Sequence, residues 1–143
     1  MAANEDLEII QGKTFTFVLR WETLPIIYKA ITGVSKAAPC VVTSVGHGIP
    51  DGWRAAVVST RGMDELKAAN QPPKDSEYHK VIVRSSSTVE LNDVNAAEYT
   101  TYVSGGYLQF YTPTVLTGFT ARMSIKDRVG GTVLVSLTTE NAG

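Results

Sequence analysis

The chain has 143 residues, and its 43% hydrophobic residues are the share found in ordinary globular proteins. Its 13 basic and 14 acidic side chains give a formal charge of −1, which argues against a nucleic-acid-binding protein with a basic patch. No apolar run approaches the roughly 20 residues of a membrane helix, and the acidic start MAANEDLEII predicts no secretory signal.

Period-two alternation of apolar and polar residues predicts β-strands near both ends of the chain, at residues 7–21, 117–127 and 131–139. In GKTFTFVLRW, the apolar face comprises Phe15, Phe17, Leu19 and Trp21. LTGFTARMSIKDR and TVLVSLTTE repeat the alternation, and KDRVGGT between them supplies the turn residues of a hairpin.

The middle of the chain predicts shorter strands in PCVVTSV, WRAAVVS, YHKVIVRSS, STVELNDV and YLQFYTPTV. One short helix is predicted in MDELKAANQ, residues 63–71, because acidic residues suit a first turn and the following prolines end a helix. The pattern as a whole predicts an all-β protein with one short helix.

The stretch GHGIPDGW, residues 46–53, combines His47 and Asp51 with three glycines and a proline. A catalytic interpretation would make His47 a base and Asp51 its orienting partner, but no nucleophile motif accompanies them. Glycine allows positive φ, proline fixes φ, and an aspartate can bind the backbone of its own turn. We therefore predict a structural turn and no catalytic residue.

Other candidate sites are equally weak. Cys40 lies in the apolar run APCVVTSV, which predicts a buried, unreactive thiol, and a single cysteine excludes an internal disulfide. A metal site of His47, His79 and Asp51 would have only two histidines and too few ligands for a tetrahedral site. The pairs SGG and VGG lack the lysine and serine of a phosphate loop. We expect no metal, no cofactor and no small-molecule ligand.

Four tyrosines are grouped within YTTYVSGGYLQFY, namely Tyr99, Tyr102, Tyr107 and Tyr111. Packing in the core and between strands would explain them. The alternative is an interaction surface for a protein or a sugar, because tyrosine is enriched at interfaces. Both interpretations stay open from the sequence.

Two sets of motifs resemble modules of tailed bacteriophages. LEIIQGKTFTFVLRW and LTGFTARMSIKDRVGGTVLVSLTTENAG resemble the BppU-like N-terminal baseplate domain, in which the second strand follows soon after the first. Here about 90 residues intervene, and their motifs ITGV, HGIPDGW, GMDEL, LNDVNAAEYT and SGG resemble an FCCH-like β module. The resemblance implies an Ig-like β-sandwich of residues 1–27 and 110–143, with a small β-barrel-like module inserted at 28–109.

The resemblance implies a non-enzymatic virion structural protein of the tail, baseplate, neck or a fibre attachment, assembled in the bacterial cytoplasm. Its partners would be other virion proteins and symmetric copies of itself, without nucleic acid or membrane. The alternatives are a capsid decoration protein and a host-surface carbohydrate-binding module. Because three strands do not complete a sandwich of about seven, we expect a symmetric neighbour or another virion protein to add a strand at an edge.

Overall fold

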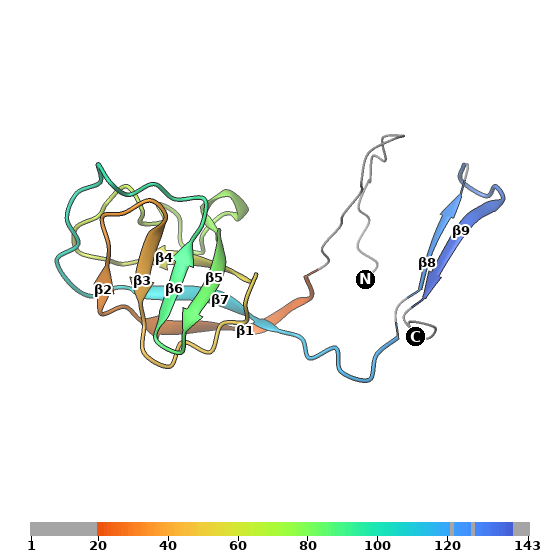
Figure 1. Ribbon diagram of the computed structural model, residues 1–143, viewed down its shortest axis with the longest axis horizontal. Coiled ribbons are helices and arrows are strands. Elements are labelled where there is room, and N and C mark those ends of the chain that lie inside the picture. Colours follow the sequence, from red (N-terminus) through yellow and green to blue (C-terminus); the bar gives the residue numbers. More distant parts are fainter. Residues whose placement is uncertain (1–19, 121, 127, 139–143) are drawn as a thin grey trace. The chain divides into compact units, whose positions relative to one another are not determined.

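The computed structural model describes residues 20–120, 122–126 and 128–138, and the chain divides into two compact units, Met1–Pro113 and Thr114–Gly143 (Figure 1). The first unit contains a seven-stranded sheet in the order β1-β7-β4-β5-β6-β3-β2, and the second contains the β8-β9 hairpin. The prediction of an all-β fold is confirmed. The predicted strand at 7–21 lies outside the described residues except for Arg20 and Trp21.

The strand pairs in the described part of the chain are all antiparallel. The strands are β1 (Glu22–Ala30), β2 (Gly33–Val34), β3 (Cys40–Thr43), β4 (Arg54–Val58), β5 (His79–Ser85), β6 (Thr88–Leu91), β7 (Tyr107–Pro113), β8 (Arg122–Lys126) and β9 (Val133–Thr138). Each strand predicted in the middle of the chain is therefore present, but it is shorter than the segment for which it was predicted.

The seven-stranded sheet folds over on itself between β4 and β5. These two strands pair only at Arg54 with Lys80 and at Ala55 with His79. Beyond this short contact, β3, β6 and β5 run across β4, β7 and β1, as Figure 1 shows. The two parts of the sheet face each other, so the first unit is sandwich-like.

The core lies between these two parts of the sheet. Its buried apolar side chains are Ile31, Cys40, Val42, Ile49, Ala55, Val57, Met63, Leu66, Val81, Val89, Leu91, Val94, Ala96, Leu108 and Phe110. Within the strands, alternation selects the core residues: Leu108 and Phe110 of β7 point inward, while Tyr107 and Tyr111 of the same strand are on the opposite face. Trp53, Tyr99 and Tyr102 pack against this core from its margin.

The predicted helix at residues 63–71 is wrong. The segment forms only a turn at 64–66, in which the Leu66 N–H donates to the Met63 carbonyl at 3.1 Å. Met63 has a φ of 53°, and beyond the turn Ala68 donates its N–H to the carbonyl of Val57 on β4 at 2.8 Å. The backbone is bound to a strand edge instead of its own next turn, and the short helix is the 3₁₀ segment Asp75–Glu77.

The predicted boundaries between the two domains, at 27/28 and 109/110, fall inside β1 and β7. These strands pair with each other along Glu22–Ala30 and Tyr107–Pro113, with an irregularity between Thr23 and Ile26. The residues on either side of both boundaries therefore belong to one sheet. The division into a framework and an inserted module stays a prediction.

Candidate interaction surfaces

The loop of residues 46–53 completes one edge of β5. The Val81 N–H donates to the Trp53 carbonyl at 2.8 Å, and the Gly52 N–H donates to the Val81 carbonyl at 2.9 Å. Further along the same strand, the Val83 N–H donates to Asp51 Oδ1 at 2.8 Å. Two backbone contacts and one carboxylate thus continue the pairing that β4 begins.

His47 makes the last contact of this edge. The residue is 2% exposed, Nδ1 of its ring accepts from the Ile49 N–H at 3.0 Å, and Nε2 lies 2.9 Å from the Ser85 carbonyl. Because Nδ1 accepts, the proton is on Nε2, which donates to Ser85. Both ring nitrogens are therefore used to hold the loop against β5.

This turn is held by other hydrogen bonds than those that its sequence predicts. Asp51 was expected to bind its own turn, but it binds Val83, 32 residues away, because β5 presents a free N–H beside the loop. His47 and Asp51 each contact β5 at a separate position. The structure does not bring them together as a base and its orienting partner.

The remaining titratable candidates also have local partners. His79 Nδ1 lies 3.0 Å from Asp93 Oδ2 at the surface. Cys40 is buried, and burial raises the pKa of its thiol to about 11, so the thiol is protonated at neutral pH. Within the described residues, no group of three or more His, Cys, Asp and Glu side chains is placed to hold a metal ion.

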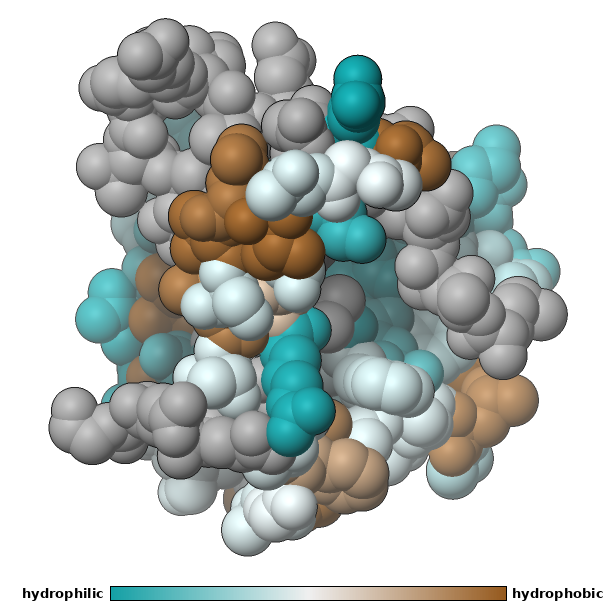
Figure 2. Space-filling model, turned by 90° about the vertical axis from the view of Figure 1, so that its right-hand side faces the viewer, coloured by the Kyte–Doolittle hydropathy of each residue, from teal (hydrophilic) through white to brown (hydrophobic). Residues whose placement is uncertain are grey.

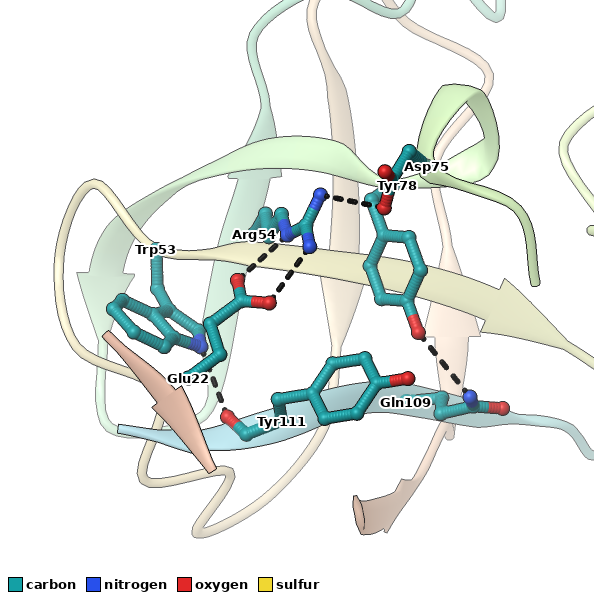
Figure 3. Close-up of polar contacts among 7 residues, drawn as sticks. All are labelled: Glu22, Trp53, Arg54, Asp75, Tyr78, Gln109 and Tyr111. Carbon is teal, nitrogen blue, oxygen red and sulfur yellow. Dashed lines mark hydrogen bonds and ion pairs between the residues drawn. The ribbon is translucent and has the colours of Figure 1, made fainter. Parts of the chain in front are cut away.

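A cluster that the sequence analysis missed ties β1, β4 and the 3₁₀ segment together (Figure 3). Arg54 contacts both carboxylate oxygens of Glu22, with Nε–Oε1 at 2.6 Å and Nη2–Oε2 at 2.7 Å. Its Nη1 donates to Asp75 at 3.2 Å, and the guanidinium lies 4.8 Å from the centre of the Tyr78 ring. The hydrogen bonds that Arg54 donates to Glu22 raise the pKa of Arg54. Through these contacts with Glu22, Asp75 and Tyr78, Arg54 acts as a structural cross-link.

Gln109 of β7 lies beside this cluster and is fully buried. Its Nε2 donates to the Tyr78 hydroxyl at 3.3 Å, and the Tyr78 and Tyr111 rings are 6.1 Å apart. Burial raises the pKa of Tyr78, so its hydroxyl stays protonated. These contacts attach residues 75–78 to the outer face of β4 and β7, and they explain why Gln109 and Ala56 are buried on that face.

The structure separates the four candidate tyrosines into two pairs. Tyr99 and Tyr102 pack against the core, and the Tyr102 hydroxyl donates to the carbonyls of Ile31 and Gly105 at 3.1 and 3.0 Å. Tyr107 and Tyr111 are on the outer face of β7. The four therefore do not share one surface, and an interaction role stays a prediction for the outer pair.

Tyr28 of β1 adds a residue that the sequence analysis did not single out. It packs edge-to-face on Tyr107, with ring centroids 6.3 Å apart and an interplanar angle of 88°. Tyr28 is 50% exposed and Tyr107 is 45% exposed. The segment ETLPIIYKA shows no clean alternation, so no local pattern predicts this face of β1.

The β8–β9 hairpin presents a second candidate surface. Its register pairs Met123 with Leu137 and Ile125 with Val135, which places these four apolar side chains on one face. Met123, Val135 and Leu137 are between 39% and 50% exposed. Ser124 and Ser136 pair on the opposite face. Figure 2 shows apolar residues, in brown, beside polar ones on one face of the molecule.

Two comparisons with known proteins find no match. No protein-family model matches the chain, and no curated protein matches it significantly. In the part of the chain that the structure describes, no helix has the length and apolar character to cross a membrane. The resemblance to bacteriophage modules therefore stays a prediction.

Proposed function

We propose that the protein is a non-enzymatic structural component of a bacteriophage virion, in the tail, baseplate, neck or a fibre attachment. It acts by binding other virion proteins and is assembled in the cytoplasm of the bacterial host. The observation that carries this proposal is the apolar face of the β8–β9 hairpin. The resemblance of the terminal strand motifs to a baseplate domain supports the location.

The physical argument concerns the stability of the hairpin. An isolated two-stranded hairpin is marginally stable in water, and a third strand or a packed surface normally stabilises it. Covering an apolar side chain fully is worth about 1.5–3 kcal/mol, so the face formed by Met123, Ile125, Val135 and Leu137 favours a protein partner. A partly exposed apolar sheet face is suited to protein contact and unsuited to a polar small molecule.

Substitution of this face tests the proposal. In phage particles assembled with Val135→Lys, we expect the protein to be lost, because a lysine would be buried in the contact. Ser136→Lys is the matched control, since it adds the same charge to the opposite face of the same strand. Mass spectrometry of purified particles gives the copy number of each variant.

The same measurement locates the protein. About 6 or 12 copies per particle would indicate the tail axis, whereas hundreds would indicate the alternative of a capsid decoration protein. Wild-type protein absent from purified particles, or Val135→Lys present at the wild-type copy number, would contradict the proposal.

A second candidate function is binding to a host-surface carbohydrate. The exposed Tyr28 and Tyr107 rings favour it, because they present an aromatic surface with polar hydroxyl groups. A glycan array would show retention by wild type and loss with Tyr107→Ala. The absence of any retained glycan would contradict this candidate.

A further inference from the structure

The outer edge of β1 ends the seven-stranded sheet. Within the described ranges, β7 is the only strand that pairs with β1. A terminal strand presents a row of backbone N–H and C=O groups that can pair with another extended chain. β1 lies at one end of the strand order, as Figure 1 shows, and the two-residue β2 lies at the other.

The register determines which backbone groups point outward. The Ile31 N–H donates to the Gly106 carbonyl at 3.0 Å, in line with the pairing of Ala30 with Tyr107. In an antiparallel pair the hydrogen-bonded positions alternate, so the backbone N–H and C=O groups of Lys29 and Ile27 also point toward β7. The backbone N–H and C=O groups of Ile26, Tyr28 and Ala30 consequently point away from β7, toward the outer edge of β1.

A contact on the other side of β7 agrees with this alternation. Tyr111, the partner of Ile26, directs its carbonyl away from β1, where it accepts a hydrogen bond from Trp53 Nε1 at 3.1 Å. The irregularity between Thr23 and Ile26 contains Pro25, which has no N–H. The usable edge is therefore confined to Ile26–Ala30.

We infer that this edge pairs with the same edge of a second copy of the chain, antiparallel and centred on Tyr28. Tyr28 then faces Tyr28 of the second copy, and Ile26 faces Ala30. All three outward-pointing residues of each copy are used, and two bonds per pair give about six hydrogen bonds. The contact is isologous, as closed two-fold symmetry requires.

Side chains favour this register over its neighbours. Lys29, the only charged residue of the segment, faces Ile27 of the second copy, whereas a register centred on Lys29 would oppose two ammonium groups. Centring on Tyr28 places two aromatic rings directly opposite each other beside the Tyr107 rings. The net charge of −1 adds little repulsion between copies.

Charge substitution at the two-fold centre tests both the contact and its register. Light scattering of the full chain should show a dimer for wild type and at least a tenfold weaker dimer for Tyr28→Lys and Tyr28→Glu, because like charges then oppose each other. Mixing the two variants should restore a dimer, since position 28 faces itself. Glu98→Lys, at an exposed loop position, is the control for added charge.

A cross-link provides a second readout that does not depend on destabilising the dimer. Hydrogen-bonded antiparallel pairs have Cα atoms about 5.5 Å apart, within the range that a disulfide spans. Tyr28→Cys should therefore form a disulfide-linked dimer under mild oxidation. Ala30→Cys alone should not, because Ala30 faces Ile26 of the second copy.

Several results would overturn the inference. These are a monomeric wild type at its highest soluble concentration, charge variants that still dimerise, a mixture that stays monomeric, or equal cross-linking of the two cysteine variants. The inference does not rest on the proposed function. Val135→Lys should leave the dimer of isolated protein intact, so loss from virions and loss of the dimer are separate outcomes.

Discussion

The two units of the chain contain strands with similar alternation but differ in how their apolar faces are covered. In the first unit, Leu108 and Phe110 of β7 are buried between the two parts of a folded sheet. In the second, Val135 and Leu137 of β9 occupy equivalent alternating positions and remain about half exposed. Alternation thus identifies a strand and its apolar face, whereas burial depends on a covering element that alternation does not specify.

The largest expected difference between the units is in the cost of removing an apolar side chain. Phe110 is 1% exposed, so Phe110→Ala should lower the free energy of unfolding by about 3–5 kcal/mol through lost burial and a cavity. Val135→Ala should cost about 1 kcal/mol or less. Chemical denaturation followed by tryptophan fluorescence and circular dichroism measures both. Equal costs would mean that the hairpin face is packed in solution.

A smaller difference is expected for two glycines with positive φ. Gly106 has a φ of 87°, and a Cβ atom there would lie 2.5 Å from Thr60 Cγ2 and 2.9 Å from the Val58 carbonyl. Gly130, in the second unit, has a φ of 73° and no neighbour within 4 Å of such an atom.

Both substitutions to alanine carry backbone strain, but only the first also displaces packed atoms. Gly106→Ala should therefore cost about 2–3 kcal/mol, and Gly130→Ala about 1 kcal/mol. Thermal unfolding of the two variants checks the order. A reversed order would mean that the backbone at Gly106, just before β7, adjusts to a Cβ atom more readily than the β8–β9 turn at Gly130.

The smallest expected effect is a pH dependence in the first unit. Hydrogen bonds from the Lys74 N–H and from Asn70 lower the pKa of Glu77. A folded-state pKa below the unfolded value adds stability at higher pH, and this stability is lost as the pH falls through the folded value.

Glu77→Gln should therefore be slightly less stable than wild type at neutral pH, and the difference should disappear as the pH falls through the lowered pKa of Glu77 in the folded protein. Denaturation midpoints at several pH values measure the difference, with Glu98→Gln as an exposed control. A difference that persists in acid would assign the effect to lost hydrogen-bond geometry.

Local patterns in the sequence were sufficient for the strands but insufficient for the contacts between distant segments. KDRVGGT predicted the hairpin because turn residues and flanking alternation are both local. The predicted helix failed because DELKAAN has a helix-forming composition, whereas the left-handed Met63 and a bond to Val57 are set by tertiary structure.

The candidate sites show the same limit. Glycine and proline placed a turn at residues 46–53, yet the partners of Asp51 and His47 lie 32 and 38 residues away. Arg54 and Glu22 are likewise 32 residues apart, and no spacing rule relates them. The four candidate tyrosines are near in sequence, but only Tyr107 and Tyr111 belong to a strand, where they share the outer face of β7. Tyr99 and Tyr102 lie in the preceding loop and pack against the core.

The loop that completes the β5 edge has a consequence for behaviour in solution. An open strand edge promotes uncontrolled association of chains, and here one imidazole and one carboxylate close part of it. Substituting these two residues would remove contacts worth roughly 1 kcal/mol each and would also uncover backbone groups of a central β-strand. We therefore expect substitution of His47 or Asp51 to increase aggregation more than the lost folding stability alone would indicate.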